Sequence, residues 1–285
     1  MRIALRWLGY AVAALLVVAL LVAAWVWFAS SRALAEAASV RPESLAELAA
    51  VDLADAERRA RTLGCVSCHG EGLTGRPMID DPKVARLHSP NLTVLAARAS
   101  DQQLAQAIRQ GVGVDGKPLF VMPSEAYQFL TDQEVAVLIA YIRSLPKRGA
   151  ASPPPAIGPL GRIGIVTDKF QTAPALVASY RARPAADLSE QYGRGRHLAM
   201  TTCSGCHGSD LSGRVVSPEI NAPSLDIAGA YDLEAFKRLL REGVAPPGRE
   251  IREMARVARE DSRFYTDGEI AALHAYLVAR AQRAQ

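Results

Sequence analysis

The sequence has little cysteine, no concentrated block of basic residues and no glycine-rich nucleotide motif. Its formal net charge is only +4 over 285 residues, and nucleic-acid binding would need a concentrated basic stripe. Neither a dinucleotide-type glycine motif nor a phosphate-binding P-loop occurs. We therefore expect no nucleic acid as a partner and no nucleotide cofactor. A composition with 49% hydrophobic and 22% charged residues also argues against disorder on a large scale.

All four cysteines fall in one pattern that occurs twice. Residues 65–69 read Cys-Val-Ser-Cys-His, and residues 203–207 read Cys-Ser-Gly-Cys-His. A thioredoxin-like redox site would need a surrounding βαβ pattern, and a zinc site would need two further ligands at a set spacing. Neither context is present. Cys-x-x-Cys-His is the pattern of c-type haem attachment, in which two thiols bond to the haem vinyl groups and the histidine supplies an axial imidazole. The sequence predicts two covalently bound haem c groups, attached through Cys65, Cys68, Cys203 and Cys206, with His69 and His207 on the irons.

A charge-free apolar run lies near the N-terminus, over residues 8–29. A helix of this length spans about 33 Å, enough to cross a hydrocarbon core of roughly 30 Å. Arg2 and Arg6 precede the run, so the positive-inside rule keeps the N-terminus in the cytoplasm. A cleaved signal peptide is the alternative, since residues 33–35 read Ala-Leu-Ala, but the apolar run is longer than usual for one. We expect a retained single-span anchor over residues 1–30 in the bacterial inner membrane, with both haem motifs in the periplasm.

The chain after the anchor contains an internal repeat. Residues 101–110 and 232–242 read as amphipathic helices that begin at acidic caps. Each is followed by a glycine, Gly111 or Gly243, at the position typical of a helix C-terminus. Both copies end in a helix opened by a capping box, at residues 131–134 and 266–269.

One methionine occupies the same place in each copy. Met122 follows Gly111 by eleven residues, and Met254 follows Gly243 by the same interval. An axial thioether must lie in a loop on the far side of the haem from the histidine, so both are candidate sixth ligands. Met122 is followed by Pro123, whereas Met254 lacks this proline. The alternatives are His274, His197 and Met200 in the second copy, and His88 and Met78 in the first.

The two closing helices carry matching residues on a core-facing stripe. Tyr141 and Tyr276 coincide, and His274 takes the place of Ile139. A lone histidine on such a stripe is more often a satisfied core residue or a haem-propionate partner than an iron ligand.

Short helices around one haem are the pattern of a class I cytochrome c domain. The region after the anchor, apart from its connector, resembles the tandem-domain cytochromes c of bacterial respiratory and periplasmic dehydrogenase chains. The resemblance implies an all-α fold in which a transmembrane helix precedes two such domains. The expected division is an anchor (1–30), a tether (31–51), a first cytochrome c domain (52–148), a proline-rich linker and connector of unassigned role (149–187) and a second domain (188–285).

The resemblance also implies roles for residues around each haem. In the family a backbone carbonyl holds the second ring nitrogen of the axial histidine, and Pro90 and Pro223 match the prolines that play this part. The alternative is that they are ordinary loop prolines. Arg76 and Arg214 occupy one position after the two motifs, and each is either a haem-propionate partner or a solvated arginine.

A His/Met axial pair raises the iron potential and fills both open positions. We therefore expect the function to be electron transfer, and we expect no enzyme activity of the chain itself. The resemblance implies a relay from a dehydrogenase or quinol-oxidising complex to a terminal oxidase or soluble cytochrome. Two alternatives stay open: a dihaem peroxidase, for which the weaker context of Met254 leaves room, and the cytochrome c subunit of a cbb3-type terminal oxidase.

Overall fold

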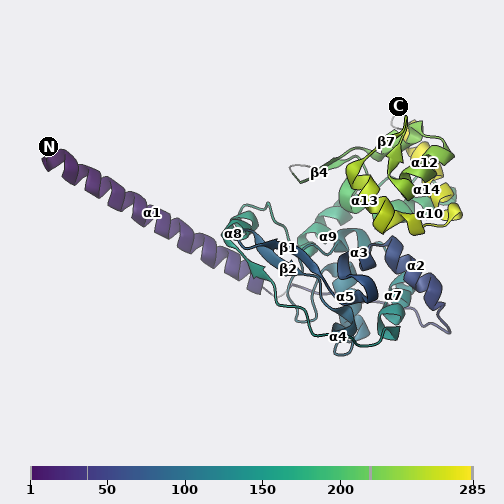
Figure 1. Ribbon diagram of the computed structural model, residues 1–285, viewed down its shortest axis with the longest axis horizontal. Coiled ribbons are helices and arrows are strands. Elements are labelled where there is room, and N and C mark those ends of the chain that lie inside the picture. The colour runs from purple at the N-terminus through teal and green to yellow at the C-terminus, as the bar shows by residue number, and fades with distance from the viewer. Residues whose placement is uncertain (1, 37, 218–219, 284–285) are drawn as a thin grey trace.

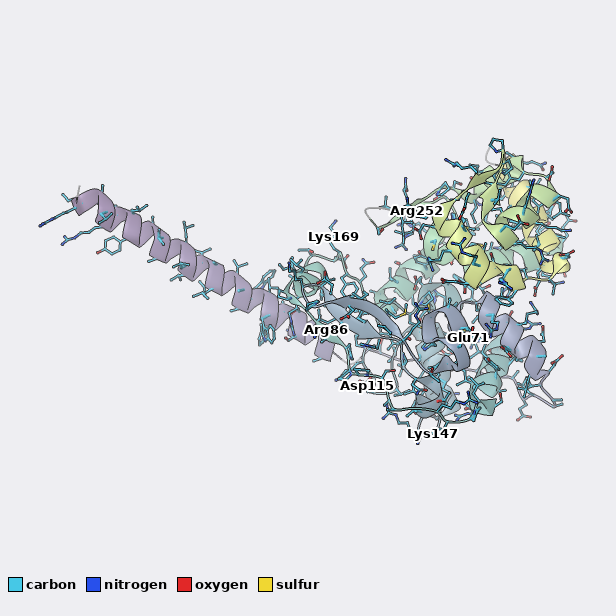
Figure 2. The ribbon with its side chains drawn as sticks, in the orientation of Figure 1. Glu71, Arg86, Asp115, Lys147, Lys169 and Arg252 are labelled. Atoms are coloured by element: carbon cyan, nitrogen blue, oxygen red, sulfur yellow. The ribbon has the colours of Figure 1, made fainter. Side chains whose placement is uncertain are left out.

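The computed structural model describes residues 2–36, 38–217 and 220–283. In Figure 1 a long helix, α1 (Arg2–Ala35), projects from two mostly helical domains that lie side by side. Figure 2 shows mainly carbon along α1, whereas charged side chains such as Glu71 and Lys147 cover the domains. The length and composition of α1 suit a membrane span. The predicted all-α class, with an apolar N-terminal helix before two domains, is confirmed.

The first domain forms around an apolar core that runs from Ala56 to Ile142. Helix α7 (Asp132–Ser144) buries Leu138 and Ile142 on one face, against α2 (Leu53–Thr62) and α5 (Asp101–Gln110). The capping box at Thr131 is present. The other elements are α3 (Cys65–His69), η1 (Glu71–Leu73), β1 (Pro77–Asp81), β2 (Ala85–His88), α4 (Leu92–Leu95) and α6 (Ser124–Tyr127).

The start of α5 differs slightly from the sequence prediction. Ser100, rather than Asp101, is the N-cap, because its hydroxyl accepts the Gln103 amide while the Gln103 side chain accepts the Ser100 amide. This is a capping box with Gln in the third position. The helix ends as predicted at Gly111, which adopts a left-handed conformation with φ 70°.

The second domain repeats this arrangement around its own core, which runs from Ala185 to Leu277. Helix α12 (Leu233–Glu242) is N-capped by Asp232, and α14 (Asp267–Arg283) closes the domain with Leu273 and Tyr276 fully buried. The remaining elements are η2 (Glu190–Tyr192), α10 (Gly193–Leu198), η3 (Ala199–Cys203), α11 (Ser204–His207), β4 (Arg214–Ser217), β5 (Ile220–Ala222), η4 (Leu225–Ala230), β6 (Val244–Ala245), β7 (Arg249–Glu250), α13 (Arg252–Glu260) and η5 (Ser262–Phe264).

The tether lies against the first domain. Residues 38–52 are largely without regular structure. Glu43 holds it in place, because its carboxylate pairs with Arg109 at 2.9 Å and its backbone carbonyl accepts from Gln102 at 2.6 Å. Arg109 also pairs with Asp132 at 2.8 Å, so one buried arginine joins the tether to α5 and α7.

The connector is an ordered structure rather than a featureless link. Strand β3 (Ala156–Ile157) adds to the β1–β2 hairpin, α8 (Pro159–Val166) packs against α1, and α9 (Ala173–Ala182) packs against α5 and α6. The helical periodicity of α8 is hidden in the sequence because close packing requires glycine. A Cβ at Gly161 would lie 2.1 Å from the Val84 carbonyl oxygen.

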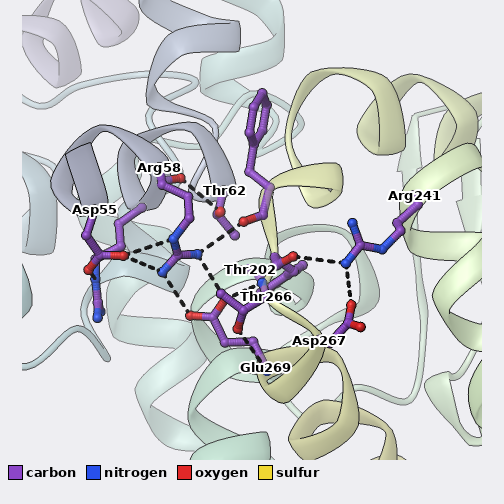
Figure 3. A network of polar contacts seen from close by, with 11 residues as sticks. Asp55, Arg58, Thr62, Thr202, Arg241, Thr266, Asp267 and Glu269 are labelled. Carbon is purple, nitrogen blue, oxygen red and sulfur yellow. Dashed lines mark hydrogen bonds and ion pairs between the residues drawn. The ribbon is translucent and has the colours of Figure 1, made fainter.

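The domains meet in a polar and apolar interface. Helix α2 of the first domain packs against η5 of the second, and α6 packs against η3 and α11. Figure 3 shows Arg58 of α2 between Asp55 on its own helix and Glu269 on α14. A second polar contact also joins the two domains. Glu134 Oε1 of the first domain lies 2.9 Å from His197 Nε2 of the second. These interdomain contacts were not predicted, because the paired residues lie far apart along the chain.

Candidate haem sites

The first Cys-x-x-Cys-His motif forms the short helix α3. Gly64 before it and Gly70 after it have φ values of 77° and 78°, a left-handed region that only glycine enters readily. These two turns place Cys65, Cys68 and His69 at one surface. The buried His69 ring holds its Nδ1 2.9 Å from the Pro90 carbonyl oxygen, so Nε2 is the nitrogen left for a metal.

A narrow apolar cleft opens beside this helix. Burial lowers the pKa of His69, which favours the neutral imidazole that ligates metals. Cys65, Cys68, His69 and Met122 all contribute to the cleft walls, so two thiols, an imidazole and a thioether meet at one apolar space. These residues fit a covalently attached haem with His/Met ligation. The other lining residues are Leu63, Gly64, Leu92, Ile108, Pro123, Tyr127, Leu130, Leu138 and Ile142.

The second motif repeats the geometry with one change in the backbone. It is entered through η3, a π-helical turn, and continues as α11. His207 Nδ1 lies 2.8 Å from the Pro223 carbonyl oxygen, and burial lowers the pKa of His207. Both histidines are thus oriented by a proline carbonyl, as the family resemblance implies.

The first cysteine of each motif is a buried thiol. Burial raises the pKa of Cys65 to about 12 and that of Cys203 to about 11. A reactive or metal-binding cysteine requires the thiolate. Moreover, no group of three or more metal-binding side chains occurs in the described part of the chain.

The two candidate methionines differ in their local structure. Met122 precedes α6 in a loop and lines the first cleft. Met254 lies on helix α13, not in the loop that the sequence comparison suggested, and packs against the core of the second domain together with Cys203. The chain from Met254 to Thr266 is three residues longer than that from Met122 to Thr131, and α13 occupies its first part.

The rival ligands in the second domain have other contacts. His274 Nε2 lies 2.8 Å from the Tyr231 carbonyl oxygen, and its ring packs beside Phe236. His197 contacts Glu134 across the interface. Met200 is buried in η3, three residues before Cys203. In the first domain Met78 and His88 lie on the β1–β2 hairpin and do not line the cleft.

The side chains of Arg76 and Arg214 each form hydrogen bonds beside a haem motif. Arg76 Nη1 donates to the Ser67 carbonyl oxygen at 3.0 Å. Arg214 donates to the Tyr180 hydroxyl, and Tyr180 in turn donates to the Ser204 carbonyl oxygen at 3.2 Å. Each arginine therefore supports the turn inside its own motif, directly in one case and through the connector in the other.

Two tyrosines that the sequence reading overlooked hold the chain just before each motif. The Tyr127 hydroxyl donates to the Leu63 carbonyl oxygen, and the Tyr265 hydroxyl donates to Thr202 Oγ1 at 2.5 Å. Their sequence signal is an aromatic residue between the candidate methionine and the closing capping box in both copies. The two tyrosines that the sequence did single out lie on the closing helices. Tyr141 is buried on α7, and the Tyr276 hydroxyl donates to the Ala186 carbonyl oxygen at 2.9 Å.

A carboxylate from each domain is buried toward the haem motif of the other. Asp261 lies between α13 and η5, close to Gly64. A Cβ atom added at Gly64 would lie 3.7 Å from Asp261 Oδ1. Glu125 lies on α6, which packs against α11. Neither Asp261 Oδ1 nor Glu125 Oε2 has a hydrogen-bond partner among the residues described. Burial raises the pKa of Glu125, and it raises that of Asp261 to about 6.

The comparisons with known proteins agree with this geometry. The cytochrome c family model matches residues 54–146 and 192–280, one match in each of the two domains. The chain belongs to the cytochrome c family, and its two cysteine pairs imply haem c. It is 26% identical over 249 residues to the fructose dehydrogenase cytochrome subunit of Gluconobacter japonicus. The match covers 75% of this chain but 49% of that relative, so the chain spans about half the relative's length.

Proposed function

We propose that the chain is a membrane-anchored dihaem cytochrome c that receives electrons from a periplasmic dehydrogenase and passes them to a respiratory acceptor. The observation that carries the proposal is the reciprocal packing of the two haem motifs. The segment after Met122 contacts the second motif, while Asp261, after Met254, contacts the turn of the first. Both haems would thus lie near one interface, which favours transfer between them. The name of the similar dehydrogenase subunit supports the choice of donor.

In this proposal each iron has a histidine and a methionine ligand. Cys65 and Cys68 attach the first haem, with His69 and Met122 as axial ligands, and haem c supplies the one-electron redox chemistry when bound. Cys203, Cys206, His207 and Met254 do the same for the second. Such filled coordination would leave no position for peroxide or oxygen. Helix α1 would hold the domains at the periplasmic face of the inner membrane.

Purification from membranes in a mild detergent would test the donor. We expect two haems per chain by the pyridine haemochrome method, and a dehydrogenase identified by mass spectrometry in the same complex. Substrate of that dehydrogenase should then reduce both haems. Co-purification with copper- and haem-containing oxidase subunits would instead favour the terminal-oxidase alternative. A reduced protein that binds carbon monoxide at both haems would contradict the electron-carrier proposal.

A further inference from the structure

Helix α8 of the connector is fastened to the end of the N-terminal helix. Arg162 Nη1 donates to Ser30 Oγ at 2.8 Å and to Ser31 Oγ at 2.9 Å. Its guanidinium carbon lies 3.7 Å from the centre of the Trp27 ring, a cation–π contact. Ser30 is fully buried by this packing. The position of α8 along α1 is therefore set at the aromatic end of the apolar run.

The opposite side of α8 is fixed to the first domain. The amide of Gly158 donates to the Val84 carbonyl oxygen at 2.9 Å, and the amide of Leu160 donates to Lys83 at 2.8 Å. Gly161 approaches the same Val84 carbonyl so closely that no side chain would fit there. As a result α8 is held by α1 and by the first domain. These contacts fix which face of α8 is left exposed.

That remaining face is apolar and exposed. The side chains of Leu160 and Ile163 are 54% and 45% exposed, and residues three apart share one face of a helix. The neighbouring end of α1 exposes Trp27 by 61% and Phe28 by 74%. These exposed apolar side chains belong to two helices that pack against each other, and apolar surface gathered in this way marks an interaction site. In Figure 1, α8 lies beside α1 at the edge of the domains from which α1 projects.

We propose that α8 lies in the interfacial layer of the bilayer, with Leu160 and Ile163 in contact with lipid. This inference rests on the proposed anchoring by α1. If residues 8–29 fill the hydrocarbon core, Trp27 and Phe28 lie at its periplasmic boundary, where aromatic residues are enriched. Because Arg162 binds Trp27, α8 sits at the same depth. The first domain then contacts the membrane at two points, α1 and α8, and its orientation to the bilayer is fixed.

Spin labelling of the full-length holoprotein in phosphatidylcholine/phosphatidylglycerol nanodiscs would test this. The native cysteines are bonded to haem in the holoprotein, so Ile163→Cys provides a single reactive thiol. We expect a nitroxide there to be several-fold more accessible to oxygen, relative to a water-soluble nickel chelate, than one at Ser179→Cys. Ser179 is an exposed residue of the next helix, α9. A label at Val17→Cys, in the middle of the apolar run of α1, gives the reference signal expected for the hydrocarbon core.

The controls separate failure of this inference from failure of the anchor. Equal accessibility at positions 163 and 179, with a lipid-like signal at position 17, would overturn the contact of α8 with lipid and leave the anchor intact. A water-like signal at position 17 would overturn the anchor and this inference with it. A second variant tests the apolar face directly: Leu160→Asp, at an exposed site, should lower the oxygen preference of the label at position 163. An unchanged preference would also count against the proposal.

Discussion

Arg58 on α2 of the first domain donates to the Glu269 carboxylate on α14 of the second at 2.9 Å. The side chains of the two residues are only 23% and 10% exposed. Arg58 also donates to the Phe264 carbonyl oxygen at 3.1 Å. One arginine thus joins α2, the helix that leads into the first haem motif, to two elements of the second domain.

Replacement of this arginine should loosen the contact between the domains. We expect Arg58→Met to destabilise the holoprotein by about 2–4 kcal/mol, because it leaves Glu269 partly buried without its partner. Thermal unfolding followed by haem absorbance would measure the loss. Arg59→Met is the matched control, since Arg59 pairs with Asp55 on its own exposed helix face, and it should cost under about 1 kcal/mol. Equal losses would exclude a special role for the interdomain pair.

Each proposed methionine ligand can be tested against a nearby methionine. Met122→Ala should open the first iron to carbon monoxide and lower its potential, because a thioether ligand raises the potential of haem iron. Met78→Ala, on the adjacent hairpin, should leave both properties unchanged. Redox titration and carbon monoxide difference spectra would provide the measurements.

The corresponding pair in the second domain is Met254→Ala and Met200→Ala. We expect only the first to create a carbon-monoxide-binding haem. A carbon-monoxide-binding haem in Met200→Ala alone would transfer the ligand role to Met200. Such a result would show that α13 does not supply the sixth ligand.

Tyr180 links the connector to the second haem motif through Ser204 and Arg214. At the first motif Arg76 contacts the motif backbone directly instead. Tyr180→Phe removes the hydrogen bonds to Ser204 and Arg214 while keeping the buried ring, at an expected loss of about 1 kcal/mol. We expect the potential of the second haem to shift and that of the first to stay constant. Ser179→Ala, which removes an exposed hydroxyl from the same helix, is the control. Shifts of equal size at both haems would refute this local role.

Asp261 makes stability depend on pH. Its pKa is raised by burial from 3.8 to about 6, so the folded state binds the proton more tightly than the unfolded state does. The resulting destabilisation is absent below pH 3.8, develops as pH rises to about 6 and is complete above it. It amounts to at most about 3 kcal/mol. Asp261→Asn should therefore raise the melting temperature at pH 8 and change it little at pH 4.

The exposed Glu250 supplies the control for this prediction. Glu250→Gln should show no gain at pH 8, because Glu250 forms a surface pair with Arg259 and does not contribute to the raised pKa of Asp261. A gain that is the same at pH 4 and pH 8 in Asp261→Asn would mean that packing, not ionisation, is responsible.

Local patterns predicted the parts of this protein that depend on local chemistry. The helix over residues 101–110 and the capping boxes at Thr131 and Thr266 are present. Each follows from hydrogen bonds within a few residues. The helical environment of Met254 was not predicted, because the equal glycine-to-methionine intervals of the two copies suggested the same loop in both.

The interface could not be read from the sequence for a different reason. Asp261 and Gly64 lie nearly two hundred residues apart, and no periodicity records their contact. Tyr180 was likewise hidden, since the connector lacks the apolar repeat that normally reveals a helix. Its helices are short: α8 depends on close glycine contacts, and α9 buries only Ala173, Val177 and Tyr180.

The connector contacts α1 through Arg162, the first domain through β3 and the second haem motif through Tyr180. If α1 and α8 contact the membrane as proposed, the same thirty-odd residues set both the tilt of the protein on the bilayer and the spacing between the two haem motifs. An insertion in this segment would alter both at once. Natural variation in its length should therefore be far more restricted than its loop-like composition suggests.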